Sequence, residues 1–390
     1  MKWLGAETVR QVEQIIQAKR IFTMIDEGRT SMAETLYQNP VDDYICENQY
    51  IKEWEKLFLE RPIVLAASAQ LATPNSFLTH DLSGIPLLLT RDNEGIVHCF
   101  FNVCRHRGAR VANGTGKAKR FVCPYHAWTF GNEGNLIARP DEGSFCSSSR
   151  DNFQLTELPV VERYGLIFGG LKANNVLDVD SALNALGPEI GSYEIANFEH
   201  FETYDAEWNL NWKLAVDTFL ESYHFNVLHH KSIHPIFYPN LGAFDGFDDN
   251  LRLFFIRRSI NEMRNLPEEE WKLLPHIAGV YILFPNTVFV WQGEHAELWH
   301  AFPLGTDRCR LRVTMLVPKA SNSARTAEHW NRNLKLLLRT VEEEDFPVGE
   351  GIQKSFRSGA QTSITFGQNE PALQHFHEAI KRSLGIKTVL

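Results

Sequence analysis

The spacing of hydrophobic residues changes along the chain, and each change predicts a different kind of structure. Over residues 6–27, apolar side chains such as Val12, Ile15 and Ile16 recur at intervals of three and four, which predicts an amphipathic helix. A second helix fits residues 46–58. We expect residues 1–58 to form a helical arm that packs on the C-terminal domain of its own chain or on a neighbouring chain.

Two further regions follow the arm. Residues 59–165 contain short alternating runs separated by turn residues, such as Asp92-Asn93-Glu94-Gly95, and this pattern predicts a small β-rich domain. Residues 166–390 mix both periods and predict an α+β domain, in which one curved antiparallel sheet wraps on a long helix. The predicted strands are 251–258, 279–284, 287–292, 297–302 and 309–317, and the predicted helices are 212–228, 325–346 and 371–383.

The composition is that of an ordinary globular protein, with 44% hydrophobic and 22% charged residues among 390. A net charge of −9 without a basic block argues against nucleic acid as a partner. No stretch approaches the ~20 apolar residues of a bilayer span, and the first residues lack the apolar core of a signal peptide. We therefore expect a cytoplasmic protein that binds neither nucleic acid nor membrane.

Two short pairs of metal-ligand residues lie in the predicted β domain. Cys104-Arg105-His106 and Cys123-Pro124-Tyr125-His126 are separated by sixteen residues, among them several glycines. Two thiolates suit one iron of a [2Fe–2S] cluster, and two imidazoles suit the other iron. A structural zinc site also uses two cysteines and two histidines, but zinc fingers usually pair like with like. The mixed pairs therefore favour the cluster over zinc.

A second set of candidate ligands lies on the helix predicted over residues 212–228. Asp217, Glu221 and His224 are spaced at i, i+4 and i+7 and would share one helical face. His229 follows five residues later, so the helix must widen, bend or end near 226–228 for both imidazoles to reach one ion. Two imidazoles and one carboxylate form the facial triad of non-haem Fe(II) oxygenases, where O₂ approaches the open positions.

The carboxylate ligand must come from another part of the chain, and Asp345 is our candidate. It ends the acidic run Glu342-Glu343-Glu344-Asp345, and a solvated acidic helix end remains the alternative on spacing alone. A di-iron site is a rival interpretation, because Glu221-x-x-His224 and Glu297-x-x-His300 both match its ligand pairs. The second of these pairs falls in a predicted strand, which argues against a helical di-iron bundle.

The two ligand sets together resemble the large (α) subunit of Rieske non-haem iron ring-hydroxylating oxygenases, over most of the chain from about residue 45. The resemblance rests on two sequence motifs, Cys104-Arg105-His106-Arg107-Gly108 and Cys123-Pro124-Tyr125-His126-Ala127-Trp128. It rests also on Asn211-Trp212-Lys213 and on the two histidines that follow, His224 and His229. The resemblance implies a Rieske domain over residues 59–165 and a helix-grip catalytic domain over residues 166–390. It assigns the cluster to Cys104, His106, Cys123 and His126, and the mononuclear Fe(II) to His224, His229 and Asp345, which stands in the family's downstream acidic motif with Glu344, Glu350 and Gln353.

The sequence departs from the family pattern at two positions. Ala127 stands where the family usually has glycine, beside His126. Glu221 stands where an aspartate usually links an iron ligand to a cluster histidine of the next subunit, and a subset that resembles quaternary-amine oxygenases also has glutamate there. We predict that Glu221 bridges His126 of one subunit to His224 of its neighbour. Asp217 is a second candidate for this bridge, or simply an acid on the helix face.

The resemblance also implies the reaction and its partners. A flavin reductase, directly or through a ferredoxin, would pass electrons from NAD(P)H to the cluster, and O₂ would be activated at the Fe(II). The chain has no Gly-rich dinucleotide motif in a strand–turn–helix context, so NAD(P)H would bind only to the partner. The expected assembly is a head-to-tail homotrimer, possibly with a small β subunit.

The substrate is the least determined part of the sequence interpretation. Aromatic compounds rank first because most of the resembled family acts on them, by hydroxylation with one or two oxygen atoms. A quaternary amine, acted on by a monooxygenase or demethylase, is the alternative. Arg252, Arg257 or Arg258 could bind a substrate carboxylate. Outside the oxygenases, the chain could be a Rieske electron carrier or a zinc-stabilised binding protein.

Overall fold

The computed structural model of the chain describes residues 6–82, 84–145, 147–319 and 324–386. These residues form two compact units. One, called here the β unit, comprises Trp54–Ala182 and Glu194–Asn197. The other, called the α+β unit, comprises the chain up to Glu53, Leu183–Tyr193 and the chain from Phe198 onward. The β unit thus extends beyond the predicted range of 59–165 at both ends.

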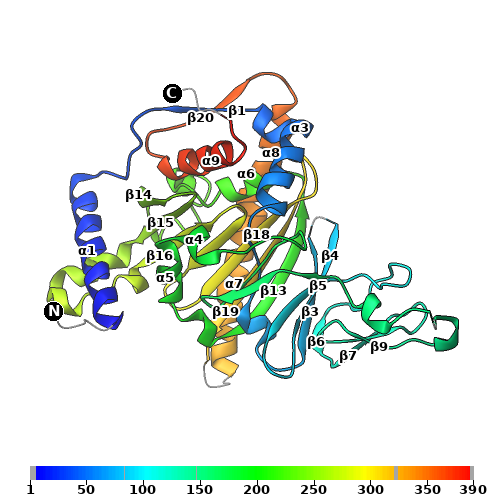
Figure 1. Cartoon of the computed structure of the whole chain (residues 1–390). Coiled ribbons are helices and arrows are strands. Elements are labelled where there is room, and N and C mark those ends of the chain that lie inside the picture. Colours follow the sequence, from blue (N-terminus) through cyan, green and yellow to red (C-terminus); the bar gives the residue numbers. More distant parts are fainter. Residues whose placement is uncertain (1–5, 83, 146, 320–323, 387–390) are drawn as a thin grey trace. The chain divides into compact units, whose positions relative to one another are not determined.

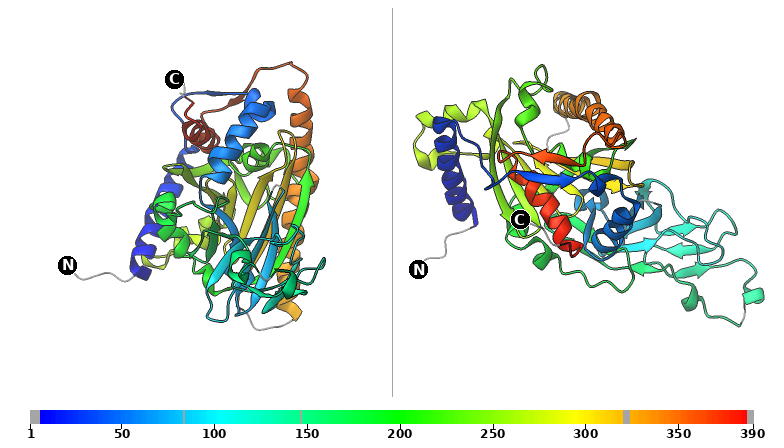
Figure 2. Two further views of the ribbon diagram at one scale, coloured as in Figure 1. Left: turned by 45° about the vertical axis from the view of Figure 1, so that its right-hand side comes forward. Right: turned by 90° about the horizontal axis from the view of Figure 1, so that it is seen from above.

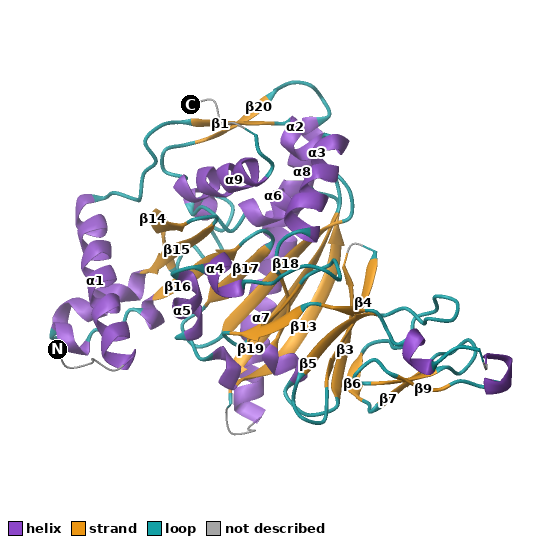
Figure 3. Cartoon of the chain, viewed as in Figure 1, coloured by secondary structure: helices purple, strands orange, loops and turns teal. Residues whose placement is uncertain are grey.

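The β unit is built from three small antiparallel sheets (Figures 1 and 3). The largest has the strand order β10-β5-β4-β3-β6, and the others are β11-β12-β2 and β7-β8-β9. Their bounds are β2 Ile63–Ala67, β3 Ser76–Leu82, β4 Ile85–Arg91, β5 Val97–Phe101, β6 Thr115–Lys117, β7 Arg120–Val122, β8 Thr129–Gly131, β9 Leu136–Ala138, β10 Glu157–Leu158, β11 Val160–Arg163 and β12 Leu166–Gly169. One ligand pair follows β5, and the other joins β7 to β8.

The α+β unit is organised around a seven-stranded antiparallel sheet within the described residues, in the order β13-β19-β18-β17-β16-β15-β14. The bounds are β13 Phe198–Trp208, β14 Phe237–Phe247, β15 Asn250–Arg257, β16 Ile277–Leu283, β17 Thr287–Trp291, β18 Ala296–Pro303 and β19 Cys309–Pro318. A separate pair joins β1 Tyr37–Pro40 to β20 Ser363–Phe366. The five strands predicted in this region are confirmed within two residues at each end, whereas β13 and β14 were not predicted.

Helices pack on this sheet, as the views in Figure 2 show for α7 and α9. Trp330 of α7 packs against Met315 and Val317 of β19, and His375 of α9 contacts Phe244 of β14. The helices of this unit are α1 Ala6–Glu27, α2 Asp42–Ile45, α3 Glu47–Glu53, α5 Leu186–Gly191, α6 Trp212–Asp217, α7 Ala324–Arg339, α8 Phe346–Phe356 and α9 Pro371–Ser383. Helix α4, Val179–Leu183, belongs to the β unit except for its last residue, Leu183. None of the described helices is both long enough and apolar enough to cross a bilayer.

Helix α1 packs on the α+β unit of its own chain. Arg20 donates to Asp245 of β14 at 2.8 Å and to the carbonyl of Phe244 at 2.8 Å. The side chain of Gln11 donates to the carbonyl of Trp271 at 2.7 Å. These contacts hold the predicted arm against β14 and against the segment around Trp271.

The helix predicted over residues 212–228 is wrong, because α6 ends at Asp217. A 3₁₀ turn over Tyr223–Asn226 follows an irregular stretch. The carboxylate of Glu221 accepts hydrogen bonds from the backbone N–H groups of Tyr223 and His224. A side chain that satisfies these donors locally competes with the helical i→i−4 ladder, so the chain turns at this point instead of continuing the helix.

The long C-terminal helix also differs from the prediction over residues 325–346. Helix α7 passes into a π-helical segment, Thr340–Asp345, and then into α8. Pro347 at the start of α8 has no N–H to give to the carbonyl four residues earlier. The widened turn thus lies at the acidic run, whereas the sequence interpretation considered a π-bulge only beside His229.

A buried ion pair anchors α6. The ammonium of Lys213 lies 2.7 and 2.8 Å from the two oxygens of Glu53 in α3, and Trp212 Nε1 donates to Glu53 at 2.9 Å. Both charged side chains are 1% exposed. Two desolvated charges are tolerated here because each has its partner and Glu53 has a further donor. The pair fixes the start of the segment that carries Glu221 and His224.

We expect Glu53→Gln to lower the free energy of unfolding of the α+β unit by about 3–5 kcal/mol, because Lys213 then keeps a buried charge without a counter-ion. The matched control is Glu328→Gln, which breaks an exposed pair with Arg332 on α7 and should cost less than about 1 kcal/mol. Urea unfolding followed by tryptophan fluorescence measures both variants. Equal stability of the two variants would contradict the structural role of Glu53.

Candidate metal centres and substrate cavity

Three predicted ligands from distant segments meet in the α+β unit. The facing Nε2 atoms of His224 and His229 are 3.0 Å apart. Asp345 Oδ1 lies 3.0 Å from His229 Nε2 and 3.6 Å from His224 Nε2. One donor atom from each residue lies within 4.8 Å of the others. Two imidazole nitrogens and one carboxylate oxygen around one point form a donor set that fits non-haem Fe(II) and leaves open positions.

Each histidine is held by a carboxylate on its other ring nitrogen. Glu221 Oε1 bonds His224 Nδ1, and Glu344 Oε2 lies 2.6 Å from His229 Nδ1. Ser232 donates to the same Glu344 oxygen at 2.6 Å. A carboxylate on Nδ1 fixes the tautomer and leaves Nε2 free to bind a metal. The sequence interpretation expected Glu221 to contact His224 as one half of a bridge to His126 of another subunit, and it gave Glu344 no role of its own. Glu344 and Asp345 both reach the histidines because they lie side by side in the π-helical segment.

The carboxylates also set the charge of this site. Burial alone would lower the pKa of His229, but Asp345 and Glu344 outweigh it and raise that pKa above its ordinary value. Burial alone would raise the pKa of Glu344, but the Ser232 hydroxyl and His229 hold it below its ordinary value. The site thus favours a positive charge at the ring of His229, and a divalent cation supplies one in place of a proton.

The positions of Asp345, Glu297 and His300 argue against the two alternatives that the sequence left open, a solvated acidic helix end and a di-iron site. Asp345 is 9% exposed and turned inward, unlike its neighbour Glu343, which is exposed, so Asp345 is not part of a solvated helix end. Glu297 and His300 lie three residues apart in β18 and therefore point to opposite faces of the sheet. They cannot complete the di-iron pair that the sequence allowed.

Asp217 lies in a different environment from the one its spacing predicted. Its carboxylate accepts from the Tyr44 hydroxyl at 2.8 Å and lies 2.9 Å from His377 Nε2. Tyr44 also lies 3.1 Å from His377 Nε2, and Asn39 contacts the other nitrogen of that ring. Asp217 therefore does not share a helical face with His224, because α6 ends at Asp217 itself. Its catalytic role stays a prediction.

The two cysteine–histidine loops of the β unit form the second candidate centre. Cys104 and Cys123 are 3% and 2% exposed, and the rings of His106 and His126 lie 4.5 Å apart, edge to face. Nδ1 of each histidine is buried without a hydrogen-bond partner among the described residues. Two such nitrogens and two buried thiols are the donors that a [2Fe–2S] cluster with mixed ligands requires, so these residues fit the cluster.

Burial shifts the pKa values of two residues in these loops. Burial raises the pKa of the Cys104 thiol, the backbone N–H of His106 opposes the rise, and Cys123 adds to it. Burial and the charges of His126 and Arg107 lower the pKa of His106, which favours the neutral imidazole that a metal needs. The His106 ring stacks on Trp128 at 5.0 Å. Ala127 has a φ of 57°, the left-handed region that favours glycine, which explains why glycine usually stands there.

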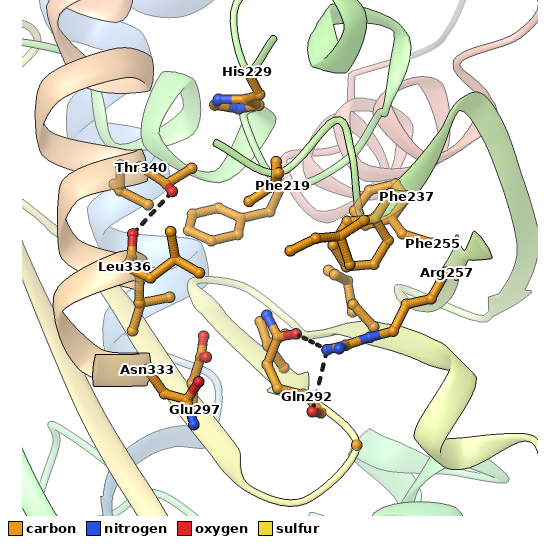
Figure 4. A pocket seen from close by; sticks show the side chains of 18 of the residues that line it. Phe219, His229, Phe237, Phe255, Arg257, Gln292, Glu297, Asn333, Leu336 and Thr340 are labelled. Carbon is orange, nitrogen blue, oxygen red and sulfur yellow. Dashed lines mark hydrogen bonds between the residues drawn. The ribbon is translucent and has the colours of Figure 1, made fainter. Parts of the chain in front are cut away.

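A cavity of about 360 Å³ opens onto the three iron-site residues. It lies between one face of the sheet and α7, because alternate residues of the strands and successive turns of the helix line it. Its middle is apolar, and its far end is polar (Figure 4). The apolar lining includes Phe219, Phe225, Phe237, Phe255, Val280 and Leu336, and the polar lining includes Arg257, Gln292, His295, Glu297 and Asn333.

Two protein-family models match the chain. Residues 61–160 match the Rieske [2Fe–2S] domain, and residues 195–386 match the catalytic domain of the ring-hydroxylating alpha subunit. The chain therefore belongs to the Rieske oxygenases, with an iron–sulfur domain followed by a catalytic domain. These domains indicate a [2Fe–2S] cluster and a mononuclear iron, which confirms the predicted fold class and cofactors.

Several similar proteins are named as monooxygenases of quaternary amines. The chain is 31% identical over 193 residues to the carnitine monooxygenase oxygenase subunit of Escherichia coli (strain K12). The aligned region covers 49% of this chain and 51% of that protein, so it spans about half of each. It is 26% identical to the chloroplastic choline monooxygenase of Spinacia oleracea over 86% of this chain and 75% of that protein. The crystal structure of a quaternary ammonium Rieske monooxygenase in complex with L-carnitine has a TM-score of 0.75 at 20% identity, over 90% of this chain and 96% of that one.

We expect Glu344→Ala to weaken binding of the mononuclear iron about 10- to 100-fold, because His229 loses the group that orients its ring. Glu343→Ala is the matched control, since Glu343 is exposed in the same π-helical segment. Iron per chain after dialysis against a graded chelator series measures the effect, with the cluster absorbance as an internal reference. Retention of iron equal to that of the control would contradict the role of Glu344.

Proposed function

We propose that this chain is the terminal oxygenase of a quaternary-amine monooxygenase. The observation that carries the proposal is the cavity: it leads from the His224, His229 and Asp345 donors through a ring of phenylalanines to buried charged side chains. Phenylalanine faces attract a cation that cannot donate hydrogen bonds. The similarity to carnitine and choline monooxygenases supports the same class of substrate.

An aromatic substrate, ranked first on the sequence, fits this cavity less well. Arg257 and Glu297 line the polar end, and Glu297 is 2% exposed. A neutral ring that fills the cavity would remove the guanidinium of Arg257 further from water without offering it a partner, which is costly. The relatives reported above favour the alternative over ring hydroxylation.

The proposed reaction inserts one oxygen atom of O₂ into a C–H bond of the amine and reduces the other atom to water, with two electrons and two protons. When bound, the [2Fe–2S] cluster would relay single electrons, and the mononuclear iron would provide the site where O₂ is reduced. His224, His229 and Asp345 would hold that iron, while Glu221 and Glu344 keep the two rings in place. The phenylalanines exclude water and direct the reacting carbon toward the histidines. The electrons would come from NAD(P)H through a partner reductase or ferredoxin.

The proposed assembly is a head-to-tail homotrimer in which Glu221 also accepts from His126 of the neighbouring subunit. Glu221 Oε1 is engaged by His224 and Oε2 by backbone N–H groups of the following turn, and the side chain is 15% exposed. A carboxylate oxygen accepts more than one hydrogen bond, so a second imidazole can reach it from outside.

A single-turnover experiment tests the proposed reaction without the physiological reductase. Protein with a reduced cluster and ferrous iron is mixed with ¹⁸O₂ and with γ-butyrobetaine, choline or naphthalene, and the products are identified by mass spectrometry. We expect one labelled oxygen on the oxidised carbon, either in an alcohol or in an aldehyde that is trapped before it exchanges with water, and no oxidation of naphthalene. A labelled diol of naphthalene together with unchanged amines would contradict the proposal.

We expect Glu221→Gln to keep both metals and to abolish substrate-dependent oxidation of the cluster. Gln still accepts a hydrogen bond from His224 but cannot carry the negative charge that stabilises two imidazoles at once. Glu221→Asp, which restores the residue usual in the family, serves as the control and should recover part of the rate. Stopped-flow absorbance of the cluster and metal analysis report on both variants, and full activity of Glu221→Gln would refute the bridge.

A further inference from the structure

Of the three arginines that the sequence offers for a substrate carboxylate, Arg257 alone lines the cavity. Arg252 is engaged elsewhere, with Glu189 at 2.7 Å and Asp245 at 2.9 Å. Arg258 is exposed and lies over the ring of Tyr238, 5.0 Å from its centroid. The three positions are thus separated by their contacts, although the sequence could not rank them.

Gln292 holds the guanidinium of Arg257 in place but bonds to only one of its nitrogens. Nη2 donates to the backbone carbonyl of Gln292 at 3.3 Å and to its side-chain oxygen at 3.0 Å (Figure 4). The group also lies 5.3 Å from the centroid of the Phe237 ring. Nε is buried without a hydrogen-bond partner among the described residues. Nε is therefore not itself open to a ligand, but Arg257 lines the cavity and Gln292 engages only Nη2, so the positive charge of Arg257 is suited to an anion that enters the cavity.

The acid nearest to this position is already engaged by other groups. Glu297 accepts from Trp299 Nε1 at 3.0 Å on one oxygen and lies 3.1 Å from His295 Nε2 on the other. Burial lowers the pKa of Arg257, and the negative charges of Glu297 and Glu294 oppose that lowering. Nη1 of Arg257, which does not contact Gln292, nevertheless remains available to a ligand.

The position of Arg257 along the cavity sets which end of a ligand reaches the iron site. In Figure 4 His229 lies at one end, Phe219 and Phe237 lie between, and Arg257 with Gln292 lies toward the other end. A molecule whose carboxylate bonds to Arg257 therefore extends its opposite end past the phenylalanine rings toward His224 and His229. A trimethylammonium group at that opposite end would lie against the rings, where a cation is stabilised.

We propose that Arg257 binds the carboxylate of the substrate, so that the substrate is a betaine, a trimethylammonium carboxylate, and not an amino alcohol. This inference rests on the proposed function and narrows its substrate class. A charged guanidinium N–H forms a charge-assisted hydrogen bond with a carboxylate, whereas an alcohol offers only a neutral, weaker acceptor. Arg257 is thus a specificity-determining residue at the end of the cavity away from the chemistry.

The test compares two ligands that differ at one end. Anaerobic calorimetric titration of the ferrous holoprotein with γ-butyrobetaine and with (4-hydroxybutyl)trimethylammonium gives both dissociation constants. We expect the wild-type protein to bind the carboxylate at least about tenfold more tightly, and Arg257→Gln to weaken that ligand about 10- to 100-fold while leaving the alcohol nearly unchanged. Arg257→Lys should recover part of the loss. Arg258→Gln is the matched control and should bind both ligands like the wild type.

The outcomes separate this inference from the function on which it rests. Metal content and thermal unfolding of each variant are measured first, and Arg257→Lys provides the comparison if the glutamine variant does not fold. Equal affinity of the wild-type protein for the two ligands, or an equal loss of both in Arg257→Gln, overturns the inference. If an amine is still oxidised in single turnover, the quaternary-amine function stands without it. If neither amine binds, both the inference and the proposed function fail.

Discussion

The proposed iron site depends on the pairing of His224 and His229 with one carboxylate each. Glu221 holds His224 and Glu344 holds His229, each through Nδ1. Because both rings are fixed from behind, both Nε2 atoms converge on the point that Asp345 also faces. Without these pairs, two histidines in an irregular segment would sample several orientations, and a metal site of fixed geometry would not be preorganised.

Irregular backbone at two places makes this pairing possible. Glu221 can reach His224 because α6 stops at Asp217 and the chain turns, and Glu344 and Asp345 both reach the histidines from a π-helical turn. Such segments have few regular backbone hydrogen bonds of their own, so neighbouring regular elements must hold them in place. The buried pair of Lys213 and Glu53 fixes α6, and the continuous run from α7 to α8 fixes the acids. The sheet then supplies the wall of the cavity with residues at alternate positions.

Sequence reasoning predicted the parts of this molecule that depend on local pattern or on ligand chemistry. The strands of the sheet from β15 to β19, the helix α9 and the two ligand sets were all visible as periodic runs or as spaced cysteines and histidines. It failed where side-chain contacts, local or distant in sequence, override the periodic pattern. The run from Trp212 to Leu228 reads as one helix, yet Glu221 caps the backbone of its own following turn. The partners of Asp217, namely Tyr44 and His377, lie 173 and 160 residues away, a separation that no local pattern reveals.

The most direct test of this account is a crystal structure of the iron-loaded protein, prepared without air, with anomalous diffraction recorded at the iron edge. The account predicts an iron peak bound by Nε2 of His224, Nε2 of His229 and Asp345, with Glu221 and Glu344 still on the Nδ1 atoms. It also predicts a pair of iron peaks between Cys104, His106, Cys123 and His126. An iron bound through Nδ1 of either His224 or His229, or an iron held by Glu344 in place of Asp345, would contradict it.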